Sequence, residues 1–542
     1  MHSGDDVDRR FPSRDACVLE PLLRRNARDR PNQLFVQFED GSAWTYRQAE
    51  DAALRAAAAF QALGVGPRDR VLSWLPNGPD ALRVWFGSNL CGAVYTPVNI
   101  AYRGQLLEHV IRNSGARTMV VHAELLPRLC EADLGGLELV IVAGGDAAPA
   151  AGARCLPVSV LEGTGLTFIP PADPVQPWDD YAVIYTSGTT GPSKGVRSTY
   201  IQLYEGVRAA YIGCGVTADD RYLLQVPLFH LGGIIGVYAM AVVGGSVVMV
   251  SAFDTARFWT VVGEHGITVC TLLGAMASFL ERRSPQPSDA NNPLRLVFMV
   301  PLVRDVLGFA RRFGVELRTM FSMTEVPPPL ISEPKSTQLG SCGRLRDGLH
   351  ARIVDTHDRE VPTGETGELI LRSDLPWSIT HGYLGAPDAT AAAWRNGWFH
   401  TGDAFRRDGA ANYYFVDRIK DYIRRRGENI SSFELEAEVL AHPAVREVAA
   451  VAVPSEDLED EILVVAAPKT GAAIDPAELI GFLSTRVPHF MVPRYVRLVD
   501  ALPKTPTAKV RKQVLRDEGV TTDTFDREQA AIRVKRDRIG ER

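Results

Sequence analysis

Short apolar segments alternate with longer amphipathic segments through the first third of this chain, and this alternation constrains its fold more than any other feature. Residues 79–90 and 105–113 have helical character, and they lie among apolar runs of strand length at residues 70–75, 92–98, 118–122 and 137–142. Strands that alternate with helices form parallel sheets covered by helices. The sequence therefore predicts an α/β fold built on parallel-rich sheets.

The length and a change of pattern predict two domains. A chain of 542 residues is too long for one hydrophobic core. After residues 413–418 a cationic run at 424–426 leads to a helix that starts near Ser432 and to two apolar strands. This last part has the size of a small α+β domain. We place the boundary near residues 418–421, which predicts a large N-terminal domain, 1–418, and a small mobile C-terminal domain, 419–542.

The charge balance and the cysteine pattern exclude several classes of protein. Lys and Arg total 59 against 65 Asp and Glu, a net charge of -6, whereas nucleic-acid binders carry a basic excess. The seven cysteines are dispersed without a CxxC pair, which argues against disulfides or a zinc site and for a reducing compartment. The most apolar stretch, 234–250, is interrupted by glycines, and residues 1–15 lack the apolar core of a signal peptide. We expect a cytoplasmic protein with no membrane span and no nucleic-acid partner.

Residues 185–196, with the sequence YTSGTTGPSKGV, are the most informative segment for function. They follow an apolar strand and combine hydroxyl side chains, three glycines and Lys194. Such a loop can surround phosphate oxygens with N–H groups and hydroxyls, while the lysine supplies a mobile cation. The string does not match GxxxxGK[ST], so it is not the usual NTPase P-loop. It predicts a phosphate site formed by Thr186, Ser187, Gly188, Thr189, Thr190 and Lys194.

This loop resembles the phosphate-loop signature of the adenylate-forming superfamily, which includes acyl- and aryl-CoA synthetases, peptide-synthetase adenylation domains and beetle luciferases. Later segments resemble further signatures of the family in the same order, so the likeness covers nearly the whole chain. Residues 424–436 and the ending PKTPTAK at 503–509 are most similar to short-chain or betaine-type CoA ligases. The resemblance implies a large N-terminal and a small mobile C-terminal domain, ATP with Mg²⁺, and an acyl-adenylate intermediate.

The same resemblance implies the nucleotide-binding residues. In the segment FSMTE, 321–325, Phe321 would stack on adenine, Thr324 would contact phosphate and Glu325 would hold Mg²⁺, a cation that prefers hard oxygen ligands. Asp403, in the segment WFHTGD, would bind the ribose hydroxyls as a bidentate acceptor. Arg418 would make a second nucleotide contact.

The C-terminal residues implied by the resemblance serve adenylation, domain rotation and thiol entry. Lys509 would stabilise charge on the attacking carboxylate and the α-phosphate, and it completes a catalytic set with Thr186, Glu325 and Lys194. Lys420 would be the hinge for rotation of the C-terminal domain. Gly427 would allow close approach of the thiol arm. The neighbouring arginines at 424–426 fit either the phosphates of CoA or a solvated turn.

The chain departs from the family pattern around the acyl pocket. The sequence FMVP at 298–301 replaces a glycine-rich turn, Ser322 replaces a glycine, and Thr199-Tyr200 replaces Ser/Thr-His. Bulkier side chains at Met299, Val300 and Ser322 predict a narrowed pocket and a small or unusual substrate. His230, in the sequence PLFHLGG, fits either the lining of this pocket or a packed core.

These features together predict an enzyme that adenylates a small carboxylic acid and transfers it to a thiol, with coenzyme A as the expected acceptor. A carrier-protein thiol is a second acceptor. An alternative is adenylation of a small inorganic oxyacid such as nitrite with transfer to an amine, as in the diazotases of bacterial secondary metabolism. A further alternative is a nucleotide-binding relative without catalysis. The acid, the pathway and the oligomeric state, including a homodimer, stay open.

Overall fold

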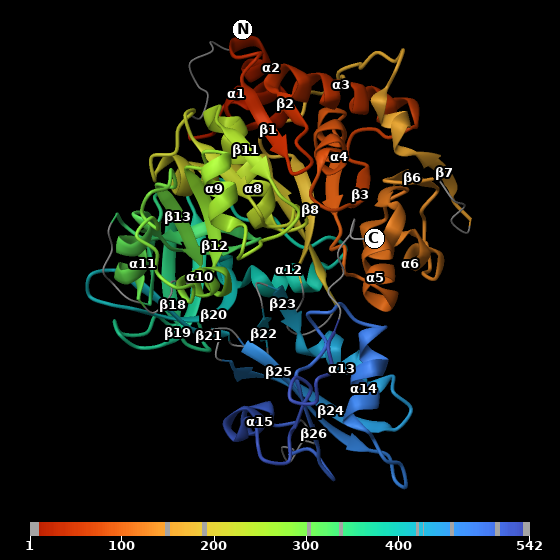
Figure 1. Ribbon diagram of the computed structural model, residues 1–542, viewed down its shortest axis with the longest axis vertical. Helices are drawn as coiled ribbons and strands as arrows, with labels where there is room; N and C mark the ends of the chain where they lie inside the picture. Colours follow the sequence, from red (N-terminus) through yellow and green to blue (C-terminus); the bar gives the residue numbers. More distant parts are fainter. Residues whose placement is uncertain are drawn as a thin grey trace.

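The structure is a computed structural model that describes residues 10–146, 152–186, 192–300, 305–334, 340–418, 422–425, 428–455, 460–503 and 510–534. In this part of the chain, three seven-stranded sheets with their helices form a large N-terminal unit. A smaller unit around a four-stranded sheet follows, and it lies below the large unit in Figure 1. The predicted fold class, a large N-terminal α/β domain with a small C-terminal domain, is confirmed.

Two of the large sheets are mostly parallel. The first has the order β14(Glu316–Arg318), β13(Leu296–Val300), β12(Val269–Leu273), β10(Arg221–Leu224), β11(Ser246–Met249), β1(Leu34–Phe38) and β2(Ala43–Thr45). The second has the order β7(Arg154–Pro157), β6(Leu139–Ala143), β5(Thr118–His122), β3(Arg70–Trp74), β4(Val94–Pro97), β8(Asp180–Thr186) and β9(Lys194–Thr199). The pairs β1–β2 and β8–β9 are antiparallel and lie at the edges. We call the β8–β9 pair, which carries the predicted phosphate loop, the phosphate hairpin.

Helices pack between and around these sheets. The helices of the large unit are α1(Arg14–Cys17), α2(Leu19–Asp29), α3(Tyr46–Ala62), α4(Pro79–Leu90), α5(Gly104–Ser114), α6(Leu126–Cys130), α7(Tyr200–Val207), α8(Leu231–Val243), α9(Phe258–Glu264), α10(Gly274–Glu281), α11(Val306–Phe313) and α12(Pro387–Ala393). Short helical turns lie at η1(Ala123–Leu125), η2(Val158–Glu162), η3(Arg208–Ile212) and η4(Arg395–Gly397). Side chains of α2, α3, α4, α7 and α8 join residues of both parallel sheets in one hydrophobic core. This core fixes the two sheets relative to each other.

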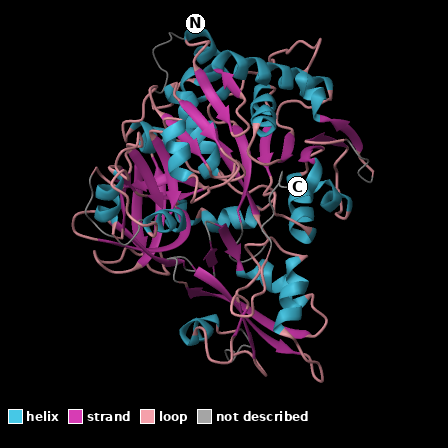
Figure 2. Cartoon of the chain, in the orientation of Figure 1, coloured by secondary structure: helices cyan, strands magenta, loops and turns pink. Residues whose placement is uncertain are grey.

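The third sheet is antiparallel. Its order is β15(Met320–Met323), β16(Val326–Ile331), β17(Ser341–Leu345), β21(Tyr413–Arg418), β20(Phe399–Arg407), β19(Gly367–Ser373) and β18(Leu349–Val354). Its own apolar cluster includes Val326, Leu369 and Phe405. Figure 2 colours every strand magenta, and this sheet is found there at the place where Figure 1 labels β18 to β21.

The small unit is an α+β fold. The hairpin β22(Tyr422–Arg425) and β23(Glu428–Ser431) precedes a sheet of β24(Val445–Pro454), β25(Asp460–Pro468), β26(Tyr495–Leu498) and β27(Phe525–Asp526), with helices α13(Ser432–Leu440), α14(Pro476–Ser484) and α15(Lys512–Glu518). The predicted helix near Ser432 is confirmed as α13. The boundary at 418–421 stays a prediction, because residues 419–421 lie outside the described part of the chain.

The elements expected from the alternation in the first third of the chain are confirmed within a few residues. The structure has strands at β3, β4, β5 and β6, and helices at α4 and α5, where the sequence predicts them. The apolar stretch 234–250 forms most of α8 and then β11. In the described residues, no helix combines the length and the apolar character needed to cross a bilayer.

Candidate active site

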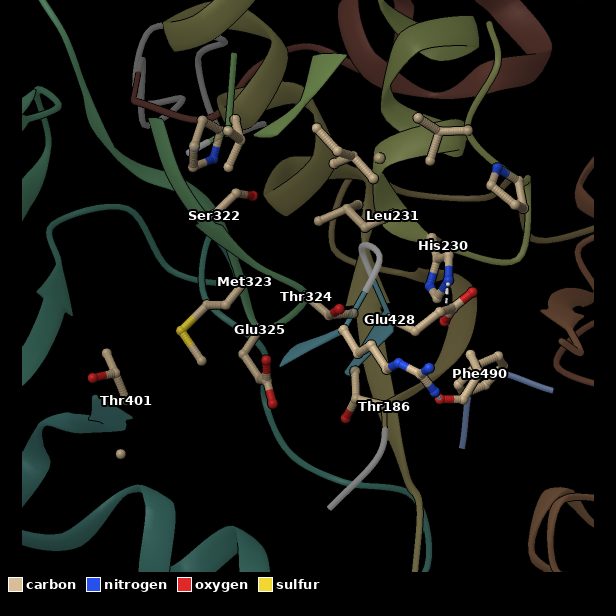
Figure 3. Close-up of a pocket in the computed structure, with 18 of the residues that line it drawn as sticks. Thr186, His230, Leu231, Ser322, Met323, Thr324, Glu325, Thr401, Glu428 and Phe490 are labelled. Atoms are coloured by element: carbon tan, nitrogen blue, oxygen red, sulfur yellow. Dashed lines mark hydrogen bonds and ion pairs between the residues drawn. The ribbon is translucent and has the colours of Figure 1, made fainter. Parts of the chain in front are cut away.

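A large cavity lies where the phosphate hairpin, the third sheet and the small unit meet. Its volume is about 1950 Å³, beyond the roughly 300–1000 Å³ of common small-molecule sites, so it has room for more than one substrate. Lining residues come from β8, β9, the β15–β16 turn, the start of α8, β20 and the small unit. Figure 3 shows Thr186, Glu325, His230 and Glu428 around this space.

The hairpin β8–β9 places two predicted phosphate contacts beside each other. Thr186 ends β8, Lys194 begins β9, and the two residues are paired in the antiparallel register. The Thr186 hydroxyl donates to the Lys194 carbonyl oxygen over 3.5 Å, and both residues line the cavity. Ser187, Gly188, Thr189 and Thr190 lie outside the described residues.

Tyr383 links the predicted metal carboxylate to the loop lysine. The Lys194 Nζ atom lies 5.0 Å from the centroid of the Tyr383 ring, over its face. The Tyr383 hydroxyl donates to Oε1 of Glu325 over 3.0 Å. Glu325 is buried and all three residues line the cavity. A cation above an aromatic face and a hydroxyl donor to a carboxylate each restrict the side chains that they join. Tyr383 therefore orders both charged groups.

Helix α7 holds the backbone at Glu325. Thr199 caps this helix in a capping box with Gln202. The buried Gln202 amide also donates to the carbonyl oxygens of Thr324, over 2.7 Å, and of Glu325, over 2.9 Å. The replacement at Thr199-Tyr200 thus lies at the start of a helix that holds the FSMTE segment in place.

Most of the FSMTE segment lines the cavity. The lining includes Ser322, Met323, Thr324 and Glu325. The Phe321 ring instead packs edge-on against Phe405, with the ring centroids 4.9 Å apart, and it is not among the described lining residues. Adenine stacking by Phe321 therefore stays a prediction.

Of the predicted ribose and acyl residues, Val300 and Ser322 are among the described lining residues of the cavity, and Asp403 and Met299 are not. Asp403 on β20 is fully buried and faces Arg418 on β21 in the strand register. Val300 at the end of β13 lines the cavity. Met299 belongs to the hydrophobic cluster of the first sheet and is not among the described lining residues, because adjacent residues of a strand point to opposite faces. Of the predicted pocket pair on β13, the structure places Val300 alone at the cavity.

His230 connects the start of α8 to the small unit. Its Nε2 atom lies 3.1 Å from Oε2 of Glu428 on β23, and both residues line the cavity. Of the two interpretations of His230, the structure therefore favours the pocket lining over the packed core. Figure 3 shows this pair at one side of the space that Thr186 and Glu325 face.

A second contact joins the phosphate hairpin to the small unit. The buried Ser193 hydroxyl donates to Oε1 of Glu434 on α13 over 2.9 Å. Burial raises the pKa of Glu434 to about 7, and the hydrogen bond from Ser193 partly offsets this because it lowers the pKa. His109 on α5 contacts the Ser193 carbonyl oxygen over 2.8 Å. Ser193, directly before β9, is thus held by groups from both units.

Arg425 has a structural environment. Its guanidinium is 2% exposed, lies 2.9 Å from a Glu461 oxygen and donates to the carbonyl oxygens of Phe490 and Val492. Arg425 is therefore neither part of a solvated turn nor free to contact phosphate, the two interpretations of the basic run 424–426. Gly427 and Lys420 lie outside the described residues.

Lys509 also lies outside the described residues, but its neighbour Val510 is placed. Val510 packs on the cluster formed by Val451, Val465 and Leu515 on one face of the β24–β25 sheet. Side chains of α13 and α14 pack on the other face. Glu428, in contrast, lines the cavity.

The comparisons with known proteins decide the family. Residues 23–384 match the family described as AMP-binding enzyme, and residues 434–509 match its C-terminal domain. The chain belongs to this family. The adenylate-forming superfamily predicted from the phosphate loop is thereby confirmed.

Named relatives of this AMP-binding enzyme include several acid–CoA ligases. A feruloyl-CoA synthase from an Amycolatopsis species is 31% identical over 504 residues, covering 91% of this chain and 97% of the relative. A sulfoacetate–CoA ligase from Cupriavidus necator is 30% identical over 509 residues, with 91% and 96% covered. A crotonobetaine/carnitine–CoA ligase from Salmonella arizonae is 29% identical over 474 residues, with 85% and 91% covered.

Solved structures show the same fold. An o-succinylbenzoate CoA synthetase double mutant from Bacillus subtilis superimposes with a TM-score of 0.79 at 22% identity, covering 92% of this chain and 98% of that one. An amide bond synthetase from Marinactinospora thermotolerans gives a TM-score of 0.78 at 23% identity, with 91% and 99% covered.

Sequence reasoning missed four residues that this AMP-binding enzyme brings to the site. Tyr383, Gln202, Glu428 and Glu434 make the contacts described above. Each contact joins residues far apart in the chain, and no local motif marks them as partners.

Proposed function

We propose that the protein is an ATP-dependent acid–CoA ligase that forms an acyl-adenylate of a small carboxylic acid and transfers the acyl group to coenzyme A. In the first step a carboxylate oxygen attacks the α-phosphorus and pyrophosphate leaves. In the second step the thiol sulfur attacks the acyl carbon, AMP leaves and the thiol proton passes to solvent. The family membership and the CoA ligases among the relatives support this proposal.

The observation that carries the proposal is the Lys194–Tyr383–Glu325 arrangement at the end of β8. It places a cation, a phenol and a carboxylate at one side of the cavity, beside the Thr186 hydroxyl. Lys194 and Thr186 would bind phosphate oxygens of ATP. The undescribed loop residues 187–190 would complete that phosphate site.

The donor set fits a magnesium ion bound with the nucleotide. Glu325 offers one buried carboxylate, and in the described residues no group of three or more His, Cys, Asp or Glu side chains could hold a metal by itself. Mg²⁺ is typically held by one or two carboxylates together with phosphate oxygens and water. Glu325 would hold the ion, which neutralises charge on the triphosphate when bound.

The remaining nucleotide roles are proposals that follow the family pattern. Asp403 would bind the ribose hydroxyls beside Arg418, and Phe321 would contact adenine. Lys509 would stabilise the charge that develops during adenylation, and Lys420 would be the hinge about which the small domain rotates.

The acceptor side of the site is proposed to involve the small domain. Glu428 and the adjoining Gly427 would line the path of the CoA thiol. Val300, Ser322 and His230 would border the acyl group. The apolar residues that also line the cavity favour a carbon acid over nitrite. Nitrite therefore serves as the competing substrate in the test.

The acids named for the relatives differ in the charge at their far end. Ferulate is uncharged there, sulfoacetate carries a sulfonate and crotonobetaine carries a quaternary ammonium group. The family alone therefore leaves the substrate class open, and the lining of the cavity has to decide it.

The test is pyrophosphate release with MgATP, a panel of carboxylic acids, and nitrite, each with and without CoA. Acid-dependent release that turns over only with CoA is expected. Lys509→Ala should lower release by roughly 100-fold or more, as the loss of one transition-state cation does. The control is Lys469→Ala, which removes an exposed lysine outside the cavity.

Other outcomes point to other functions. Release with nitrite and an amine but without CoA would move the protein to the nitrogen-activating alternative. CoA-independent release that needs a carrier protein would change only the acceptor. ATP binding without release under any condition would contradict the catalytic proposal.

A further inference from the structure

The cavity continues from the phosphate hairpin into the large unit, toward the carboxyl ends of the first parallel sheet. The walls of this branch are apolar and include Ile235 on α8, Leu273 on β12, Met276 on α10 and Met320 on β15. An acid whose carboxylate lies near Lys194 and Thr186 would extend its chain along these walls. Burial of such a chain is favoured by about 25 cal/mol per Å² of apolar surface.

The end of this branch is polar. Tyr211 on η3, Gln225 after β10 and Thr271 on β12 line it, and Tyr211 and Gln225 are each 3% exposed. Thr271 lies two residues before Leu273 on the same face of β12, so it is about 7 Å deeper along the strand. These three side chains therefore form a hydrogen-bonding end beyond the apolar walls.

The groups at this end are held in fixed positions. The Tyr222 hydroxyl donates to Oγ1 of Thr271 over 2.8 Å, and the Gln225 amide nitrogen donates to the Thr271 carbonyl oxygen over 2.9 Å. The Tyr211 ring packs against Tyr222 and Phe298, with centroids 5.9 and 5.1 Å apart. Because the amide nitrogen of Gln225 is engaged, the amide oxygen remains as an acceptor for a substrate group.

The described residues of the branch offer no ionic partner for a charged substrate end. On η3, β10, β12, α10, β13 and β15, and in the segments that join them to the cavity, the described lining residues include no Lys, Arg, Asp or Glu. His230 lies at the start of α8 and is paired with Glu428 at the mouth. A buried charge without a partner costs far more than a hydrogen-bonded neutral group. The lining thus discriminates by charge.

We propose that the substrate is a carboxylic acid with an uncharged acyl group that ends in a hydroxyl, which hydrogen-bonds Gln225 and Thr271 in this branch. The inference rests on the proposed adenylation. Sulfonate-ended and ammonium-ended acids are expected to be poor substrates because the described residues of the branch supply no countercharge. Acids without the hydroxyl are poorer because they bring no donor to the amide oxygen of Gln225.

The experiment compares acids that differ only at the far end. One series is 3-phenylpropanoate with hydrogen, hydroxyl, sulfonate or trimethylammonium at the para position. A second is butanoate with the same groups at carbon 4. The readout is kcat/KM for acid-dependent pyrophosphate release. The hydroxyl acid of at least one series should exceed the unsubstituted acid by about tenfold or more, and the charged acids should be poorer still.

The outcomes separate the inference from the proposed function. A charged acid that equals or exceeds the hydroxyl acid would overturn the inference and leave the ligase proposal standing. Equal activity of the hydroxyl and unsubstituted acids in both series would also overturn it. No release with any acid would contradict the proposed function and remove the basis of the inference with it.

Variants of Gln225 test the residue itself. Gln225→Leu should reduce the preference for the hydroxyl acid over the unsubstituted acid to about threefold or less, with the KM for ATP unchanged. Gln225→Glu should instead raise the relative activity of the ammonium acid. The matched control is Gln176→Leu, since Gln176 donates to the Pro174 carbonyl oxygen over 2.8 Å and does not line the cavity. An unchanged preference in Gln225→Leu would refute the role of this residue.

Discussion

Removal of one hydroxyl group tests whether Tyr383 positions the Glu325 carboxylate. The Tyr383 hydroxyl donates to Glu325 over 3.0 Å, and Lys194 lies over the ring of the same residue. In Tyr383→Phe the ring and its contact with the lysine remain, while the hydrogen bond is lost. A hydrogen bond to a charged group contributes about 1.5–3 kcal/mol. If the bond holds Glu325 in its reactive orientation, kcat/KM for pyrophosphate release should fall by about 10- to 100-fold.

The assay is pyrophosphate release at several Mg²⁺ concentrations. A positioning role predicts that Tyr383→Phe needs more Mg²⁺ for half-maximal activity, since the carboxylate is no longer held. The chain offers a matched control in Tyr414, whose hydroxyl donates to Asp408 over 3.0 Å and whose ring lies 4.0 Å below the Arg406 guanidinium. Tyr414→Phe should leave both quantities unchanged. Equal activity of the two variants, with the same Mg²⁺ dependence, would refute the reasoning.

Three further predictions concern stability. Burial raises the pKa of Glu434 from 4.5 to about 7, so the contribution of this group to stability is complete below pH 4.5 and is lost as the pH rises through 7. Urea unfolding should show up to about 3 kcal/mol more stability at pH 5 than at pH 8. Glu434→Gln should remove this difference, whereas the exposed control Glu478→Gln should not. Arg425→Met leaves the Glu461 carboxylate buried without its cation and should cost about 3–5 kcal/mol in urea unfolding, which the added change Glu461→Leu should largely restore; no recovery would contradict the ion-pair account. Gly87→Ala places a methyl group 2.5 Å from a methyl group of α3 and should cost about 1–3 kcal/mol, and an unchanged urea midpoint would show that the two helices can separate.

The parallel sheets could be predicted because their signal is local. The strands β3 to β6 are short apolar runs, and α4 and α5 lie between them with their own periodicity. The third sheet lacks such a signal, because β17 pairs with β21 across the intervening strands β18 to β20. Pairing over that distance depends on packing that no single segment records.

In the candidate site, too, the residues of local motifs could be predicted and the long-range contacts could not. The phosphate loop and the FSMTE segment are contiguous motifs, and their described residues Thr186, Lys194 and Glu325 meet at one cavity. The contact between His230 and Glu428 spans 198 positions and leaves no trace in either motif. Met299 was expected to line the pocket beside Val300, but a strand has two faces and its residue types do not say which face meets the cavity.

The double hydrogen bond from Gln202 has a consequence for how this chain can change in length. The helix α7 joins the phosphate hairpin to the backbone at Thr324 and Glu325, so two segments of the candidate site, more than a hundred positions apart, move as one body. One residue inserted before Gln202 in this helix would turn its side chain by roughly 100° away from both carbonyl oxygens. We therefore expect insertions among relatives to accumulate in surface connections and to be absent from these eight helical residues.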